Sequence, residues 1–325
     1  MTTIKDVAQH AGVSTATVSR VLNGHAAPTP RTRARVLAAV DELGYRPNAL
    51  ARSLRTTSTR TLGLIVGDLA NPFFAEVARA VEEEARAHGF CVVVAGTDES
   101  ADRQAAHVRT LLDRRVDGLL VCPATDDPDR LAEVAARGVP LVLLDRAVRG
   151  TTCPVVRADG ARALADLADA LRSAGHRRVG VIAGPAGAGR ERLEQFARGG
   201  LEPVVVHGDL RRDSGARAAA DLLDRPDRPT ALVAMDDLMG LGALEELRRR
   251  GLRVPADVGL AVYGDQPWFP LLDPPITVVA QPTAELGREA ARSLLALVAG
   301  ERPADVRLTA RLVARGSCGE ATGAA

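Results

Sequence analysis

The first 45 residues place hydrophobic side chains at helical spacing in three short blocks. The apolar positions of these blocks are Ile4, Val7, Ala8 and Ala11, then Val18, Val21 and Leu22, then Val36, Val40 and Leu43. Each block follows a signal typical of a helix start, and these signals are Thr3 with Asp6, Ser14, and Thr29 with Pro30. The pattern predicts a bundle of three short helices, and the short AGVS turn between the first two predicts a helix-turn-helix.

Beyond residue 60 the pattern changes to short apolar runs that alternate with amphipathic stretches. These runs are LGLIV, FCVVVA, DGLLVC, PLVLLD, RVGVIAG, PVVVHG, ALVAMD and VGLAVYG. Short buried strands that alternate with helices are typical of parallel sheets with right-handed crossovers. About nine such strands are too many for one small sheet. The sequence therefore predicts an α/β body behind the helical N-terminus.

Parallel sheets bind ligands beyond the carboxyl ends of their strands, which marks candidate binding segments in this body. These segments are Asp68 to Phe74, Asp145-Arg146, the Gly184–Arg192 loop, Asp236-Asp237, and Asp265. Phe73 or Phe74 beside Arg and Asp side chains suits a sugar or another polar small molecule. The reason is that an aromatic ring packs on an apolar face while the charged groups donate and accept hydrogen bonds.

Charge separates the N-terminus from the body. The first 60 residues hold nine Lys/Arg and three acids, a balance of +6, which leaves −5 for the remainder of a chain with net charge +1. A basic end on an acidic body favours a module that binds a polyanion.

The outward positions of the second predicted helix are Thr15, Ala16, Thr17, Ser19 and Arg20. Small side chains let a helix sit deep in the major groove, where Arg20 can bond guanine and the Thr15 and Ala16 methyls can contact thymine.

The segments TIKDVAQHAGVSTATVSRVLNG and GYRPNALARSLRT closely resemble the head and hinge of the lactose-repressor (LacI/GalR) family of transcription regulators. The resemblance extends along the whole chain. It implies that Thr15, Ala16 and Arg20 face bases. It also implies that mainly phosphates are contacted by Thr3, Ser14, Thr17, Ser19 and Asn23. The alternative role for the three helices is binding another protein.

The hinge carries a further implication of the resemblance. Asn48 to Leu54 is shorter than the ~12–15 residues that an isolated helix needs for stability. In the family this hinge folds only on the operator, and a Leu matching Leu54 enters the central minor-groove step, where an apolar wedge kinks the duplex. Arg52 and Arg55 can then face the charged DNA backbone. The alternative for Leu54 is a hydrophobic contact with the head.

The resemblance implies an α/β fold class with a helix-turn-helix head (1–46), a hinge (47–60) and a two-lobed, periplasmic-binding-protein-like body of two parallel sheets. The first lobe takes 61–157 and 282–312, and the second takes 158–281 and 313–325. Arg192 matches the effector-binding Arg of the family, Asp265 matches a binding Asp, and Asp236 stands where many members have Asn. The other expected cleft residues are Asn71, Phe73, Arg146 and Gln281.

Three departures from the family pattern lie in the second lobe. The usual Gly-Tyr/Phe-Asp is here Tyr263-Gly264-Asp265, with its first two residues exchanged, and Gln195 stands where Gly is usual. The loop before Arg192 and the segment 196–204 are also shorter than usual. These positions line or support the cleft, so the departures point to an altered pocket and a weak or lost effector response.

The sequence offers little support for an enzyme, a cofactor or a metal. The loop GPAGAGR has P-loop glycine spacing, but Arg190 and Glu191 replace the Lys and Ser/Thr that such a loop needs. The four cysteines lie far apart without a CxxC pair, and the six histidines show no paired metal-ligand spacing. The N-terminus lacks a signal core, and no apolar run approaches the ~18 residues of a membrane span. These features predict a soluble cytoplasmic protein.

The combined reading is a sequence-specific, DNA-binding transcriptional regulator that acts as a repressor. A homodimer would place two heads on a pseudo-palindromic, double-stranded operator. A small-molecule effector, expected to be a sugar, would bind between the lobes and change the operator affinity. The alternatives are a sugar-binding module without regulatory DNA binding and, with no catalytic constellation to support it, an enzyme.

Overall fold

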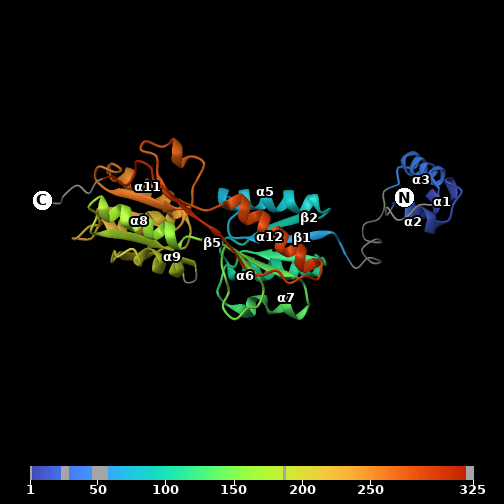
Figure 1. The fold of residues 1–325 in the computed structure, drawn as a ribbon, viewed down its shortest axis with the longest axis horizontal. Helices are drawn as coiled ribbons and strands as arrows, with labels where there is room; N and C mark the ends of the chain where they lie inside the picture. Colours follow the sequence, from blue (N-terminus) through green and yellow to red (C-terminus); the bar gives the residue numbers. More distant parts are fainter. Residues whose placement is uncertain (1, 23–28, 46–57, 186–187, 320–325) are drawn as a thin grey trace. The chain divides into compact units, whose positions relative to one another are not determined.

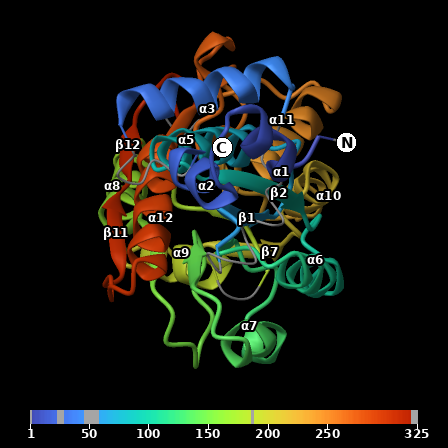
Figure 2. The ribbon, with the colours of Figure 1, turned by 90° about the vertical axis from the view of Figure 1, so that its right-hand side faces the viewer.

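The computed structural model describes residues 2–22, 29–45, 58–185 and 188–319. The chain divides into two compact units, Met1–Thr59 and Arg60–Ala325, which we call the head and the body. The described part of the head holds α1 (Ile4–His10), α2 (Thr15–Leu22) and α3 (Pro30–Glu42), so the three expected helices are confirmed (Figure 2). Four residues expected to bind DNA lie outside the described residues, and these are Asn23, Arg52, Leu54 and Arg55. Most of the expected hinge lies outside them too.

The helix-start signals of the head act as the sequence predicts. The Thr3 amide donates to Asp6 Oδ2 at 2.7 Å and the Thr3 hydroxyl oxygen accepts from the Asp6 amide at 3.4 Å, which completes a capping box. Thr29 caps α3, whose first residue is Pro30. The apolar faces meet in a small core whose fully buried members are Val7, Val18 and Val36. The Arg35 guanidinium donates to the Ala11 carbonyl oxygen, which ties α3 to the turn after α1.

The body contains two six-stranded sheets. The first has the order β11-β5-β4-β3-β1-β2 and is parallel throughout. Its strands are β1 (Thr61–Val66), β2 (Cys91–Gly96), β3 (Gly118–Val121), β4 (Leu141–Leu144), β5 (Val155–Asp159) and β11 (Val306–Thr309). The second has the order β12-β10-β9-β8-β6-β7. Its strands are β6 (Val179–Ala183), β7 (Val204–His207), β8 (Ala231–Ala234), β9 (Gly259–Tyr263), β10 (Thr277–Ala280) and β12 (Arg311–Val313). The second sheet departs from the expected parallel arrangement at one edge, because β12 runs antiparallel to β10.

Helices cover both faces of each sheet, so each lobe has two hydrophobic cores (Figure 1). On the first sheet, α5 (Pro72–Ala87) and α12 (Thr283–Val298) cover one face, and α6 (Ala101–Asp113) and α7 (Ala132–Ala136) cover the other, where the short 3-10 helix η1 (Pro128–Leu131) also lies. On the second sheet, α8 (Ala161–Ser173) and α9 (Ala188–Ala197) lie opposite α10 (Arg212–Leu223), α11 (Asp237–Arg249) and the 3-10 helix η2 (Phe269–Leu271). Strands buried on both faces explain the continuous apolar runs of the sequence.

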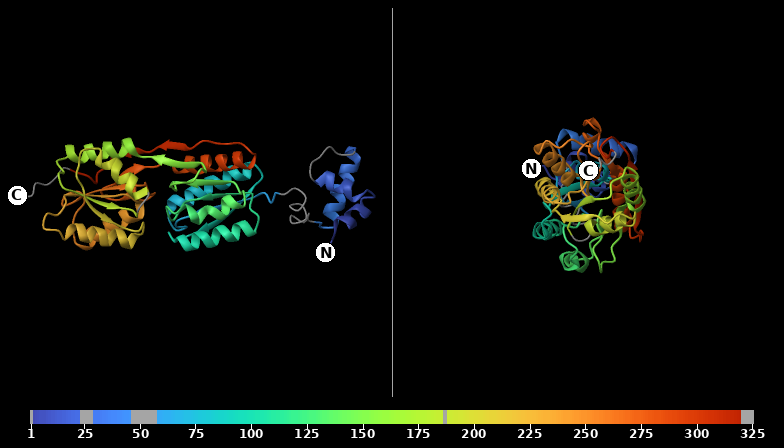
Figure 3. Two further views of the ribbon diagram at one scale, coloured as in Figure 1. Left: turned by 90° about the horizontal axis from the view of Figure 1, so that it is seen from below. Right: turned by 90° about the vertical axis from the view of Figure 1, so that its left-hand side faces the viewer.

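The chain passes between the lobes three times: after β5, after β10, and between β11 and β12. These crossing segments run alongside one another in the left view of Figure 3, in green and red. The third passage lies at Ala310, since Leu312 already pairs with Val279 in the second sheet. The expected lobe boundary after 312 therefore falls inside β12 and moves to about residue 310.

None of the helices in the described parts of the chain has both the length and the apolar composition that crossing a membrane requires.

Candidate functional site

The outward face of α2 is built from small side chains and one arginine. Thr15, Ala16 and Arg20 are exposed, while Val18 and Val21 are buried on the opposite face. The expected cap is present, because the Ser14 hydroxyl oxygen accepts from the Thr17 amide at 3.2 Å. No bulky side chain on this face keeps the α2 backbone from approaching a flat or grooved partner.

Three expected phosphate-contacting residues, Thr3, Ser14 and Thr17, are already engaged within the head. Thr3 Oγ1 donates to Asp6 Oδ2 at 2.8 Å, and Thr17 Oγ1 lies 2.9 Å from Ser14 Oγ. These hydroxyls still have lone pairs, but their rotamers are fixed by the caps. Helix N-termini fixed in this way present backbone amides, which are the groups that suit phosphate oxygens.

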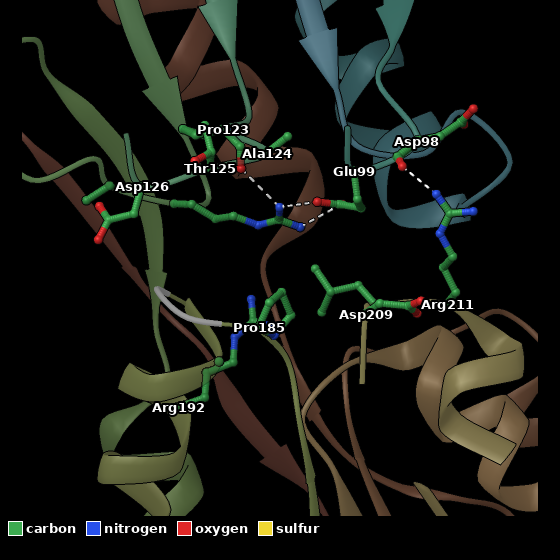
Figure 4. Close-up of a pocket in the computed structure, with 14 residues that line it drawn as sticks. Asp98, Glu99, Pro123, Ala124, Thr125, Asp126, Pro185, Arg192, Asp209 and Arg211 are labelled. Atoms are coloured by element: carbon green, nitrogen blue, oxygen red, sulfur yellow. Dashed lines mark hydrogen bonds and ion pairs between the residues drawn. The ribbon is translucent and has the colours of Figure 1, made fainter. Parts of the chain in front are cut away.

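A cavity of about 380 Å³ lies between the two lobes of the body (Figure 4). The side chains that line it follow the carboxyl ends of strands in both sheets, as expected for ligand sites of parallel sheets. Glu99 and Arg146 come from the first lobe, whereas Arg192, Asp209 and Arg211 come from the second. Figure 4 shows Glu99 above the cavity and Arg192 below it.

A smaller space, which we call the inner chamber, adjoins this cavity and has a volume of about 30 Å³. It shares four lining residues with the cavity: Glu99, Arg146, Arg192 and Leu210. Its further polar and aromatic lining is Asp68, Asn71, Phe73, Phe74, Asp145, Asp236, Asp237, Tyr263 and Gln281. Six of the seven expected effector residues therefore come together here, and the exception is Asp265.

Arg146 holds the first-lobe wall of the cavity. Its guanidinium donates to both carboxylate oxygens of Glu99, at 2.5 and 2.9 Å, and to the Pro123 carbonyl oxygen at 3.0 Å. Burial alone would lower the pKa of Arg146, but its hydrogen bonds to Glu99 and the charges of Glu99 and Asp145 hold that pKa well above its usual value. The pair is a fixed hydrogen-bonding wall of the kind that bidentate Arg–carboxylate geometry provides.

Arg192 holds the second-lobe wall. It donates to the Met235 carbonyl oxygen at 2.9 Å and to Asp145 Oδ1 at 3.4 Å, and its guanidinium lies 4.1 Å from the centre of the Tyr263 ring. Gln281 Nε2 donates to the same Asp145 oxygen at 3.3 Å. Asp145 therefore links the first lobe to a residue of the second and to a crossing segment. Burial lowers the pKa of Arg192, but Asp145 and Tyr263 outweigh it and leave that pKa raised.

Direct hydrogen bonds join the lobes at the inner chamber. Asn71 Nδ2 from the first lobe donates to Asp237 Oδ1 of the second at 2.9 Å. Gln266 Nε2 donates to Asn71 Oδ1 at 3.3 Å and also to Asp237 Oδ2. At the rim, the Arg211 guanidinium donates to the Asp98 carbonyl oxygen (Figure 4). The lobes are thus in direct contact in this structure, and separating them at the inner chamber would break these bonds.

Asp265 lines neither the cavity nor the inner chamber, so its expected role in effector binding stays a prediction. It is exposed and pairs with Arg315, whose Nη2 and Nη1 lie 2.6 and 2.9 Å from its two carboxylate oxygens. Gly264 has a φ of +103°, and the chain turns there so that Gln266, 2% exposed, takes the inward position. The sequence pattern did not predict this turn, because the order of Tyr263 and Gly264 is exchanged relative to the family. The sequence also did not predict Gln266 and Glu99 as residues of the site.

Other residues considered as reactive or metal-binding have structural contacts. His176 is buried, with Nδ1 2.9 Å from Thr230 Oγ1 and Nε2 2.8 Å from the Cys318 carbonyl oxygen. His176 has a structural role, because it ties the C-terminal segment to the second sheet. Across residues 2–22, 29–45, 58–185 and 188–319, no group of three or more His, Cys, Asp and Glu side chains is arranged to hold a metal ion.

Two family models match the two units. The model of bacterial regulatory proteins of the lacI family matches residues 3–48, and the model of periplasmic binding proteins and sugar binding domain of LacI family matches residues 59–316. The chain is 34% identical over 305 residues to the HTH-type transcriptional repressor PurR of Photobacterium profundum, covering 91% of each. It is also 34% identical over 308 residues to the repressor CytR of Escherichia coli (strain K12), covering 92% of this chain and 90% of CytR.

Solved structures agree with these matches. A lac repressor dimer bound to operator and the anti-inducer ONPF has a TM-score of 0.87 at 29% identity, over 98% of this chain and 99% of that one. A complex of the transcriptional regulator CelR with cellobiose has a TM-score of 0.72 at 35% identity, over 98% of this chain and 100% of that one. The α2 face thus lies in the unit that matches the regulatory-protein model, and the cleft lies in the unit that matches the sugar-binding model. This chain is a DNA-binding transcriptional regulator and belongs to the LacI family of bacterial regulatory proteins.

Proposed function

We propose that this chain is a cytoplasmic homodimeric repressor that reads a pseudo-palindromic operator through α2 and responds to a sugar bound between its lobes. The observation that carries the proposal is the presence of both parts in one chain. A basic head exposes small side chains and Arg20, and a body encloses a polar cavity of about 380 Å³. Sites for small molecules typically measure about 300–1,000 Å³.

The head reads sequence through the exposed face of α2. Arg20 donates two hydrogen bonds to a guanine, while the methyl groups of Thr15 and Ala16 pack on thymine methyl groups. Backbone phosphates are contacted by Thr3, Ser14, Thr17, Ser19 and Asn23. These contacts fix the register of α2 in the groove and supply most of the salt-dependent affinity.

The segment between head and body takes the roles that its sequence suggests. Leu54 enters the central minor-groove step and kinks the duplex, and Arg52 and Arg55 face the DNA backbone. These three residues lie outside the described part of the chain, so their roles rest on the sequence alone.

An exposed apolar edge on the body supports the homodimer. Strand β2 forms the outer edge of the first sheet, and its Val93 and Val94 side chains are 40% and 39% exposed. In the second lobe, Leu271 is 84% exposed. An uncovered apolar edge strand is an aggregation hazard, and natural proteins cover such surfaces. The occupant that fits is a second copy of this chain, in keeping with the lac repressor dimer among its structural neighbours.

The cleft couples the effector to the operator through lobe closure. Arg146, Arg192 and Asp209 offer donors and acceptors from both lobes to one ligand. A sugar bound across them favours one arrangement of the lobes, and that arrangement changes how the two heads of the dimer meet the operator. Coupling free energies of this kind are typically about 1–3 kcal/mol.

Selection of DNA from a random-sequence pool by the full-length protein tests the proposal. We expect the selected DNA to be a pseudo-palindrome with two half-sites. We also expect a sugar from a screened panel to change the affinity of the protein for this DNA. A protein that binds a sugar yet enriches no DNA sequence would instead be a sugar-binding module without a regulatory role.

A further inference from the structure

The inner chamber is lined by more acidic than basic side chains. Five carboxylates line it: Asp68, Glu99, Asp145, Asp236 and Asp237. Two arginines line it, and each forms an ion pair with one of these acids. Arg146 pairs with Glu99, and Arg192 pairs with Asp145. Among the described residues, the remaining three acids have no cation within 4.0 Å, and these are Asp68, Asp236 and Asp237.

Two acceptors at or beside the chamber lack a hydrogen-bond donor among the described residues, and only one of them, Gln266 Oε1, is a buried atom. Asp236 Oδ1 accepts from the Met239 amide at 3.0 Å as the cap of α11, and the described residues provide no donor for its second oxygen. Gln266 bonds Asn71 and Asp237, both of which line the chamber, and its own Oε1 is buried without a partner in the described part of the chain. A buried acceptor such as Gln266 Oε1 is normally satisfied by a protein group, a water molecule or a ligand, whereas the second oxygen of Asp236 is accessible to a donor in the cleft.

The size of the chamber limits what can fill it. Its volume of about 30 Å³ exceeds the ~10–15 Å³ that one water-sized group needs but is far too small for a sugar ring. The ring fits the adjoining cavity of about 380 Å³, which shares Glu99, Arg146 and Arg192 with the chamber. One substituent of a ligand in the cavity can therefore project into the chamber.

We propose that this substituent is a protonated amine, so that the effector is an amino sugar or a similar polar amine. This rests on the proposed function only in that the effector occupies the cleft. An ammonium group supplies three donors and a positive charge, whereas a hydroxyl supplies one donor and no charge. A phosphate or carboxylate on the ligand would meet more acidic than basic side chains, which disfavours a second anion at this position.

The electrostatics of the two adjacent aspartates agree with this assignment. Burial raises the pKa of Asp236 well above its ordinary value, and the neighbouring charge of Asp237 raises it further. Burial also raises the pKa of Asp237, although bonds from Asn71 and Gln266 oppose the shift. A cation in the chamber would stabilise the ionised forms, since opposite charges at short distance favour ionisation.

Matched ligand pairs test the amine directly. Isothermal titration calorimetry of the full-length protein compares D-glucosamine with D-glucose, D-galactosamine with D-galactose, and the glucosamine disaccharide with cellobiose, at a pH that keeps the amines protonated. We expect the amine member of at least one pair to bind at least about tenfold more tightly than its neutral partner, because its hydrogen bonds are charge-assisted.

The variant Asp236→Asn isolates the charge. Asn caps helices as well as Asp does, so the bond to the Met239 amide is kept while the negative charge is lost. We expect this variant to lose most of the preference for the amine. The control is Asp265→Asn, which removes a carboxylate of the same lobe that lines neither the cavity nor the inner chamber and should leave the preference unchanged.

The outcomes separate this inference from the proposed function. Equal affinity within every pair, a preference for the neutral members, no binding of any member, or an unchanged preference in Asp236→Asn each overturns the amine assignment. An amine that binds as expected but leaves operator affinity unchanged would support the chamber assignment and contradict the proposed regulatory role.

Discussion

Arg20 is the exposed side chain on α2 with the greatest capacity to choose between bases. In the proposed complex, the neighbouring Thr15 and Ala16 offer methyl groups to shape and thymine. Because the face is otherwise small, the proposal assigns most of the polar discrimination in the head to this one guanidinium.

Replacing Arg20 by Ala should remove discrimination at one base pair of each half-site, at a cost of about 1–3 kcal/mol. Binding titrations on operators that carry every base at each position measure this change. Arg31→Ala, at the start of α3, is the control and should weaken all operators alike. A uniform loss across all operators in Arg20→Ala would instead make Arg20 a phosphate contact.

Individual cleft residues were predictable where a strand end fixed their position. Arg146, Arg192 and Asp236 follow recognisable strands, and all three reach the cleft. Asp265 also follows a strand, yet the positive φ of Gly264 turns it outward to Arg315. Backbone direction after a strand depends on one dihedral angle, which the residue pattern alone does not reveal.

Strands with polar residues in them were harder to find than apolar ones. β5 contains Arg157 and Asp159, and β11 and β12 alternate or mix polar and apolar positions. These strands lie at or next to the edge of a sheet, where they are less completely buried than the central strands. The apolar runs of the sheet centres were visible for the opposite reason, because both of their faces are buried.

The end of α11 should make stability depend on acid pH. Glu246 bonds Arg249 and Arg250 at 2.7 and 2.6 Å, and these bonds lower its pKa from 4.5 to about 2. A pKa lower in the folded state means that this contribution is complete above about 4.5 and is lost as the pH falls towards 2. We expect the stability gap between wild type and Glu246→Gln to shrink over that range in urea denaturation. The matched change at exposed Glu245 should cost less than about 0.5 kcal/mol, and a gap at Glu246 that does not change with pH would contradict the assignment.

At the scale of the whole molecule, the bonds between Asn71, Asp237 and Gln266 hold the lobes together. Asn71→Asp keeps the cap of α5 but replaces the donor that faces Asp237 by a carboxylate. We expect a more open body with a larger radius of gyration in small-angle X-ray scattering. Thr29→Asp changes the cap of α3 in the head, outside both lobes, and should leave the radius unchanged. An unchanged radius of gyration in Asn71→Asp would show that these bonds do not control how far the lobes close.

The apolar edge at β2 gives a second expectation for the whole molecule. Val93→Lys places a charge on the proposed dimer surface and should shift the protein towards monomer in sedimentation velocity. Operator affinity should fall with it, since two linked heads bind far better than one. Ala135→Lys, on the exposed side of α7, is the control. A Val93→Lys protein that remains dimeric would place the interface elsewhere.

The two-lobed plan was predictable because alternating strands and helices extend along the body and the head has a specific motif. The contacts between the lobes were not predictable, because Asn71, Asp237 and Gln266 come from segments far apart in sequence. Their meeting depends on how closely two separately folded lobes approach each other.

The most direct test of the account is one comparison of operator binding by fluorescence anisotropy, with the full-length chain and with residues 60–325. The body is a compact unit by itself, so it can be studied without the head. We predict that the full chain binds its selected operator specifically and with a steep loss of affinity as salt increases, whereas the body alone binds no operator. Specific binding of the operator by residues 60–325 would contradict the account.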